Sequence, residues 1–474
     1  MRKSLLFLLG TLACSSLHAA SVSPYIPLKS DPLLENDIET LAIVANIPKV
    51  IKPYNVNVIL DALPKIKHGY PELYFRLYRS LRPYKSQFAI THSTVSVFDS
   101  GDTAHPIPNA RGATTDNRYL LSSRAQWQVT DWLGVYLGTE LSQQHKQATG
   151  SMLSLGFNWA QLDVGYRDHW YSPFTGHSQI MSTNAKTFPS VTLSNNLPIT
   201  FLDTNLNYEF FLAQTDRQPV LFNGQWSDKN KPLLAGFHFS FEPIDGWTLG
   251  VNRVFQFGGG ERKVSFKTLV KAFVDPGGAD NTREDLTSDQ EAGNQVASIT
   301  SKMNFDAPIP FSVIAELAGE DTSNSKNYQF GNPVLAFGLH FPMLFDDKVS
   351  FGYEYSYWTS GWYQHHLYRD GFVNDKFVLG HWALQQQREQ GTALEGESHY
   401  LRTQYRFDNN HNLITQIRLI NQKETAKKKY KNSWEIETEY VMPWQDNLVS
   451  VGAYLGEDIL GKNFWQARFS FKWI

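Results

Sequence analysis

The sequence predicts an all-β membrane protein: a transmembrane antiparallel β-barrel of about 18 strands after a small N-terminal periplasmic α-helical domain. Three observations predict it. The chain opens with the pattern of a secretory signal, its final strand alternates between apolar and polar residues, and short and long connections alternate between its strands. Aromatic residues make up 14% of the chain, yet no segment after the signal is apolar enough to span as a helix. This combination is typical of a barrel.

Residues 1–20 have the three parts of a signal peptide: a basic start, an apolar run over 5–13 and a small-residue cleavage site. The apolar run is about half of the ~20 residues that a spanning helix needs, which disfavours a membrane anchor. A lipoprotein signal would use Cys14, but Thr11 rather than leucine stands three positions before it. Cys14 is the only cysteine, so the mature chain is expected to have no disulfide and no cysteine metal site.

Residues 21–84 read as a periplasmic domain of three short helices. Asp31 has the character of an N-cap, and Pro32 suits the first helical turn. Apolar residues then recur at helical spacing at Leu34, Ile38, Leu41 and Ala42. Two more helices are expected over 56–63 and 72–81.

From residue 85 to residue 474 strands and connections alternate. Short turns lie at 130–131, 243–246, 307–310, 345–347, 408–410 and 443–446. Long connections cover roughly 99–117, 168–186, 216–232, 257–294, 321–333, 359–397 and 422–431. Outer-membrane barrels have short periplasmic turns and long extracellular loops, which sets the direction of every strand. An even strand count requires a strand near 187–194, a tight turn at 195–198 and an outward strand over 199–214.

The final strand, 465–473, shows the barrel pattern most clearly. Its apolar face carries Trp465, Ala467, Phe469, Phe471 and Trp473, and its polar face carries Gln466, Arg468, Ser470 and Lys472. Successive side chains of a strand point to opposite faces. A soluble sandwich would bury the apolar face in its core, whereas a membrane barrel turns it to lipid. The export signal favours the barrel, with this strand closing against 86–98.

Three long loops carry unusual motifs. They are His169-Trp170-Tyr171-Ser172-Pro173 with Ser182-Thr183-Asn184-Ala185, Gly250-Val251-Asn252-Arg253 with Phe257-Gly258-Gly259-Gly260, and Tyr368-Arg369-Asp370-Gly371 with Gly380-His381-Trp382. Together with the helical leader and the barrel pattern, they resemble the Wzi family of outer-membrane capsule-assembly proteins over nearly the whole mature chain. The resemblance implies a bacterial outer-membrane barrel with a periplasmic helical bundle. It also implies a lectin-like role, in which capsular polysaccharide is bound and organised at the cell surface.

Side chains in these loops suit that role. Flat aromatic rings cover the apolar faces of sugars, and Arg and His supply directional hydrogen bonds. The expected binding residues are Trp170, Tyr171, Arg253, Tyr368, Arg369, His381 and Trp382. The alternative to sugar contact is that these side chains are buried and hold their own loops in place. Arg253 has two interpretations, contact with an acidic sugar or an ion pair with a lumen carboxylate, and the second is preferred. Trp358 and Trp362 are expected in the aromatic girdle.

Several other loop segments could each have more than one role. Residues 263–273 have helical amphipathic spacing, which suits a lid over the mouth or a helix on the outer leaflet. The acidic residues that follow, up to Glu291, suit a solvated loop better than a calcium site. The basic hairpin tip, formed by Lys423 and residues 427–431, either attracts lipopolysaccharide and capsule or keeps the hairpin soluble. His365 and His366 are expected to bind no metal, because neighbours on a strand point apart and no third ligand lies nearby in sequence.

No nucleophile elbow and no convincing Ser/His/Asp set is present, so we expect neither enzyme activity nor a cofactor. The expected partners are capsular polysaccharide, outer-membrane lipid and lipopolysaccharide, and a periplasmic protein that meets residues 21–84; no nucleic acid is expected. Two alternatives stay open: a porin or substrate-specific channel, and a soluble secreted β protein.

Overall fold

The computed structural model describes residues 22–473, apart from 158, 264–290, 292, 324–325, 346, 424–428 and 446; residues 321–329 are described by their backbone alone. The predicted signal peptide lies outside the described residues. So do nearly all of the predicted amphipathic segment 263–273 and the acidic segment up to residue 290. Among the described residues no helix is long and apolar enough to cross a membrane.

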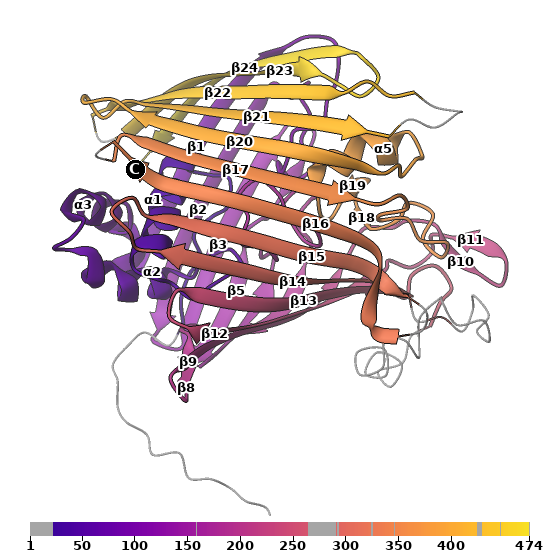
Figure 1. Cartoon of the computed structure of the whole chain (residues 1–474), viewed down its shortest axis with the longest axis horizontal. Helices are drawn as coiled ribbons and strands as arrows, with labels where there is room; N and C mark the ends of the chain where they lie inside the picture. The colour runs from indigo at the N-terminus through magenta and orange to yellow at the C-terminus, as the bar shows by residue number, and fades with distance from the viewer. Residues whose placement is uncertain are drawn as a thin grey trace, which may run out of the picture.

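Eighteen antiparallel strands form a closed barrel (Figure 1). In chain order they are β1 (Phe88–Ser100), β2 (Tyr119–Thr130), β3 (Leu133–Ser142), β5 (Met152–Phe157), β6 (Ala160–Gly165), β7 (Ser190–Ser194), β9 (Thr204–Gln214), β12 (Leu233–Ile244), β13 (Trp247–Phe257), β14 (Gly293–Phe305), β15 (Phe311–Ser323), β16 (Lys326–Leu344), β17 (Val349–Trp358), β20 (Gly396–Arg406), β21 (Asn412–Gln422), β22 (Ser433–Trp444), β23 (Asn447–Glu457) and β24 (Asn463–Trp473). The barrel closes where β1 pairs with β24, and the hydroxyls of Ser96 and Ser470 meet across this seam at 2.8 Å. The predicted strand number and closure are confirmed.

The connection between β7 and β9 differs from the prediction. We expected one strand over 199–214, but β8 (Ile199–Phe201) turns back on β9 through Leu202 and Asp203, whose φ angles are both positive. Beyond this hairpin, β9 pairs with β7 on one side and with β12 on the other, as a strand of the barrel wall. The reason is length, because about 9–11 residues already cross the membrane and the remainder folds as a small hairpin.

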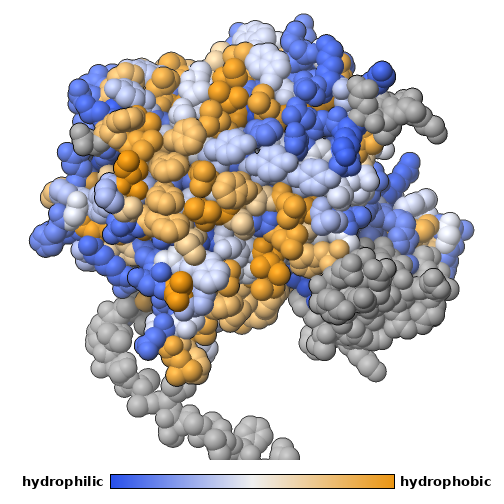
Figure 2. All heavy atoms as spheres, in the orientation of Figure 1, coloured by the Kyte–Doolittle hydropathy of each residue, from blue (hydrophilic) through white to orange (hydrophobic). Residues whose placement is uncertain are grey.

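The wall shows the predicted alternation of apolar and polar faces. On β24, Trp465, Phe469 and Trp473 are each nearly half exposed, while Gln466 and Ser470 are buried on the inner side. Figure 2 shows apolar side chains gathered across the visible wall of the barrel. In a soluble protein such a broad apolar surface would be a liability, whereas in a bilayer it meets lipid.

A helical region precedes the barrel and sits at one of its ends (Figure 1). It consists of α1 (Pro32–Val44), α2 (Val56–Ala62), η1 (Leu63–Ile66), α3 (Pro71–Ser80) and η2 (Pro83–Lys85). The carboxylate of Asp31 caps α1 by accepting hydrogen bonds from the Leu33 and Leu34 amides, both at 3.1 Å. The predicted cap is therefore correct. The assignment of this region to the periplasm stays a prediction.

α1 is buried on two sides. Its apolar side chains, such as Ile38 and Leu41, pack within the helical region. Its polar side chains face the barrel wall instead: Asn36 accepts hydrogen bonds from Ser350 and Arg402, and Asp37 pairs with Arg406 at 3.2 Å. Because buried polar groups are stable only when paired, these contacts fix the helical region in the mouth of the barrel.

Two long loops fold back into the lumen, and we call them together the plug: residues 166–189 and 359–395. The second contains β18 (Val373–Asn374), β19 (Phe377–Val378), η3 (Trp382–Leu384) and α5 (Gln385–Glu389). Plug residues pack against nine inward-facing apolar residues of eight strands, namely Phe211, Ala213, Leu234, Val254, Val296, Ala318, Val334, Trp358 and Ile420 from β9, β12–β17 and β21. An apolar layer therefore crosses much of the lumen.

The positions of two tryptophans correct a prediction. We expected Trp358 and Trp362 in the outer aromatic girdle. Both are buried in the plug core, at 0% and 2% exposure, and Trp358 donates a hydrogen bond to the Leu394 carbonyl. Trp358 is one of the alternate residues of β17 whose side chains point into the barrel, and Trp362 lies in a loop that turns inward. Neither side chain therefore reaches lipid.

Candidate functional site

The end of the barrel opposite the helices carries a projecting hairpin, β10 (Val220–Phe222) and β11 (Gln225–Ser227) (Figure 1). We call residues 219–227 and 365–370 the outer platform, because the two segments join through their backbones. Val220 bridges Tyr368, and the Leu221 amide donates to the Leu367 carbonyl at 2.8 Å. The platform lies at the long-loop end, which in bacterial barrels is extracellular.

Tyr368 fixes the platform to the barrel. Its side chain is 1% exposed and packs with Val220 and Leu367. Its hydroxyl donates to the carbonyls of Gln256 and Gly258, at 3.3 and 3.2 Å, where β13 ends. Tyr368 therefore holds the loop in place, which is the alternative considered for it, and it has no surface available for a sugar.

Trp226 and Arg369 are the exposed side chains of the outer platform that suit a polysaccharide. Trp226 is 47% exposed on β11, and Arg369 is exposed at the point where its amide donates to the Pro219 carbonyl at 3.1 Å. Arg369 is among the residues that the sequence analysis expects to bind sugar, whereas Trp226 is not. The sequence signal for the hairpin that carries Trp226 is Asn223-Gly224; both residues have positive φ and form the tight turn typical of a hairpin.

Trp170 and Tyr171 lie inside the barrel rather than at its surface. The Trp170 indole donates to the Phe174 carbonyl at 3.1 Å, and its backbone pairs with that of Lys52 in the helical region. Tyr171 is 0% exposed in the plug core. Trp170 therefore joins the plug to the helical region, and Tyr171 packs within the plug core. Neither side chain is placed to contact a sugar at the cell surface.

His381 and Trp382 are buried as well. The His381 ring stacks on His177 at 4.6 Å, and the Trp382 indole donates to the Gly176 carbonyl at 3.1 Å. These contacts connect the two plug loops. Burial and the neighbouring His177 hold the pKa of His381 well below its usual range, so the ring is uncharged at neutral pH.

Arg253 is one of the alternate residues of β13 whose side chains point away from the lumen. Its neighbours Asn252 and Val254 point inward and are buried, whereas Arg253 is half-buried and hydrogen-bonds Gln295 on β14. The preferred ion pair with a lumen carboxylate is therefore wrong, because the side chain projects from the other face of the strand.

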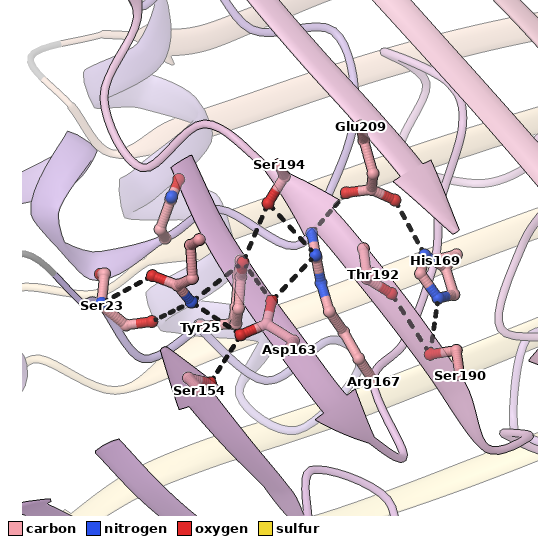
Figure 3. A network of polar contacts seen from close by, with 12 residues as sticks. Ser23, Tyr25, Ser154, Asp163, Arg167, His169, Ser190, Thr192, Ser194 and Glu209 are labelled. Atoms are coloured by element: carbon pink, nitrogen blue, oxygen red, sulfur yellow. Dashed lines mark hydrogen bonds and ion pairs between the residues drawn. The ribbon is translucent and has the colours of Figure 1, made fainter. Parts of the chain in front are cut away.

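A polar network ties the N-terminal segment to the barrel wall and the plug (Figure 3). The Tyr25 hydroxyl donates to Asp163 on β6 at 2.8 Å, and Asp163 pairs with Arg167 at 3.1 Å. Arg167 also pairs with Glu209 on β9, whose second oxygen contacts His169 at 2.8 Å. All these groups are buried, so each charge depends on its partners.

A chamber of about 320 Å³ lies between the helical region and the plug. Its lining includes Trp170 and cationic residues of the wall and the N-terminal segment. Two wall cations pair with carboxylates: Arg418 with Glu437 at 3.0 Å, and Arg468 with Glu439 at 2.8 Å. A third, Arg402, donates to the Asn36 side chain and to the Pro32 carbonyl. These three cations therefore have partners within the protein.

Basic residues flank the hairpin that joins β21 to β22. Lys423 contacts Glu395 at 2.5 Å, and Lys431 contacts Glu457 at 2.9 Å. Residues 424–428, which include Lys427 and Lys428 of the predicted basic tip, lie outside the described residues. The described lysines at 423 and 431 therefore have carboxylate partners within the protein.

The expectation that the side chains of His365 and His366 point apart is wrong. The two residues occupy a turn closed by a bridge from His365 to Tyr368, so their rings stack at 4.6 Å instead of pointing apart. A carboxylate that is distant in sequence also comes close, because Glu291 reaches His366 from just before β14 at 2.7 Å.

These features define a class: an outer-membrane β-barrel that is closed by its own loops and a helical region, with a rigid platform at its outer end. The chain matches the family model described as capsule assembly protein Wzi over residues 109–454. It belongs to the Wzi family of capsule-assembly proteins, and the resemblance drawn from its loop motifs is confirmed.

The chain also resembles a solved structure in its fold and a second protein over a short segment. The chain matches Wzi of Escherichia coli, described as an outer-membrane, carbohydrate-binding β-barrel involved in group 1 capsule assembly, with a TM-score of 0.70 at 16% identity. The match covers 94% of this chain and 98% of the other. An uncharacterized 55.8 kDa protein in the cps region of Klebsiella pneumoniae is 34% identical over 92 residues, which are 19% of this chain and 17% of that protein.

Proposed function

We propose that this protein binds capsular polysaccharide at the cell surface and so attaches or organises the capsule there, without covalent chemistry. The observation that carries the proposal is the outer platform, where Trp226 and Arg369 are exposed on a hairpin that Tyr368 fixes to the barrel. Membership of the capsule-assembly family and the carbohydrate binding ascribed to the E. coli protein support it.

The two side chains suit an acidic sugar chain. An exposed indole offers a large flat apolar area at little entropic cost. A guanidinium offers paired N–H donors that match a carboxylate. Because the platform is already ordered, little conformational entropy would be lost on binding.

The porin alternative is disfavoured by the plug. A porin needs a continuous aqueous path, whereas here an apolar layer of plug and wall residues crosses much of the lumen. The chamber lies on the helical side of that layer, where it contacts Trp170 and the N-terminal segment.

Two further partners belong to the proposal. Lipopolysaccharide would surround the outer wall near Lys423 and Lys431. A periplasmic protein would meet α3, on which Phe75 and Tyr78 are exposed at 63% and 45%. Cross-linking from position 75 in intact cells tests the second contact, and capture of lipid alone would contradict it.

Substitution of Trp226 tests the site directly. Trp226→Ala is expected to weaken binding of the host's capsular polysaccharide about tenfold, because a lost aromatic contact is worth roughly 1–1.5 kcal/mol. Co-sedimentation with the detergent-purified protein measures it. The matched control is Trp132→Ala, since Trp132 is 52% exposed at a short turn on the opposite end. Equal binding by Trp226→Ala and wild type would contradict the site, and no binding by wild type would contradict the function.

A further inference from the structure

Three side chains of types that bind metals converge at the outer platform: His365 and His366 of the platform itself, and Glu291. One carboxylate oxygen of Glu291 and one ring nitrogen each of His365 and His366 all lie within 4.8 Å of one another. The closest contact joins Glu291 Oε2 to His366 Nε2 at 2.7 Å, and the two imidazole rings stack at 26°.

The surrounding structure positions these groups. The turn between His365 and Tyr368 brings the two rings together, and Tyr368 is itself fixed to the end of β13. Arg262 holds the Glu291 main chain by donating to its carbonyl at 2.5 Å and to the Leu221 carbonyl at 3.1 Å. Glu291 and His365 are each 9% exposed, whereas the His366 side chain is 44% exposed. The cluster is therefore partly buried but open to solvent on the His366 side.

We propose that Glu291, His365 and His366 form a binding site for a first-row transition-metal dication such as Zn²⁺, with one coordination position open to solvent. Two imidazole nitrogens and one carboxylate oxygen suit zinc, nickel or copper, whereas calcium and magnesium prefer oxygen ligands alone. Three protein ligands leave the fourth position of a tetrahedral ion for water or another ligand.

The geometry requires only small adjustments. Ligands about 2.0–2.1 Å from a tetrahedral Zn²⁺ lie roughly 3.3–3.5 Å from one another, so side-chain rotations bring the three atoms into range. Burial, together with the neighbouring His366 and Arg262, lowers the pKa of His365 to about 3, so its ring is neutral at physiological pH. Coordination through Nε2 of His365 would keep the hydrogen bond that Nδ1 accepts from the Leu367 amide at 3.2 Å, whereas coordination through Nδ1 would replace it.

The alternative explanation is a simple ion pair between Glu291 and His366. An ion pair needs one histidine, whereas the structure brings two rings to the same carboxylate. The positive charge of Arg262 nearby opposes a cation, which makes the affinity of the site depend on the carboxylate of Glu291.

Zn²⁺ titration of the full mature chain, purified in detergent without a histidine tag, tests the proposal. Calorimetry should show one Zn²⁺ per chain, and His366→Ala and Glu291→Gln should each weaken binding at least tenfold. His366 is largely exposed, so its removal should leave the fold intact, which heat-modifiable gel mobility verifies. The matched control is His68→Ala, an exposed histidine of the helical region that should bind as wild type.

Three outcomes would overturn the site: no stoichiometric Zn²⁺ bound by wild type, folded His366→Ala and Glu291→Gln variants that bind as wild type does, or tighter binding of Ca²⁺ than of Zn²⁺. The test uses the metal alone, so its result is independent of polysaccharide binding by Trp226 and Arg369.

Discussion

Arg167→Met is expected to destabilise the folded barrel by about 3–5 kcal/mol, the usual cost of removing one partner from a buried ion pair. Arg167 is buried between Asp163 and Glu209, and its guanidinium also lies 4.1 Å from the centre of the Tyr25 ring. Methionine keeps much of the volume but leaves two carboxylates without their cation. The loss should loosen the N-terminal segment and the plug together, because the network joins both to the wall.

Urea-induced loss of heat-modifiable gel mobility measures this effect in lipid vesicles. The matched control is Arg118→Met, since Arg118 pairs with Asp99 at 3.0 Å while 52% exposed, and such surface pairs contribute less than about 1 kcal/mol. Similar midpoints for Arg167→Met and Arg118→Met would show that the network in Figure 3 does not hold the segments together.

Acid is expected to release the helical region from the barrel. Burial alone would raise the pKa of Glu39, but Lys52 at 2.7 Å and Lys302 at 3.7 Å lower it from 4.5 to about 2. Because the folded pKa lies below the unfolded one, the Glu39 charge stabilises docking above pH 4.5. That contribution, about 3 kcal/mol, is lost as the pH falls from about 5 towards 2.

Hydrogen exchange of the α1 amides at pH 7 and pH 3 measures this release. Glu39→Gln should exchange faster than wild type already at pH 7, because Lys52 and Lys302 then lack their anion, and its protection should change less on acidification. Glu72→Gln, at an exposed position of α3, is the control and should follow wild type. Identical pH profiles for wild type and Glu39→Gln would contradict this role.

The barrel could be predicted because its signals are local. The alternation along β24, the cap at Asp31 and the alternation of turn lengths each follow from neighbouring residues, and each is found in the structure. The hairpin of β8 could not be anticipated, since the turn at Leu202 and Asp203 lacks the usual Gly or Asn signal.

The site was harder to predict because it depends on where loops go. Loop length indicates the outer side of the membrane but not whether a loop folds back, so Trp170, Tyr171, His381 and Trp382 were expected outside and are buried. The proximity of Glu291 to His365 and His366 could not be predicted, because Glu291 is far from them in sequence and meets them only in the folded chain. For Trp226, in contrast, the Asn-Gly turn just before it was a usable signal.

A capsule-attachment assay in a deletion strain tests the proposed function most directly. The strain would be complemented with wild type, the Trp226→Ala/Arg369→Ala double variant, or the Trp132→Ala control, each verified as assembled in the outer membrane. Cell-bound and released polysaccharide would then be measured separately. The double variant should lose most cell-bound capsule while polysaccharide continues to appear in the medium. Undiminished cell-bound capsule in the double variant would contradict the account.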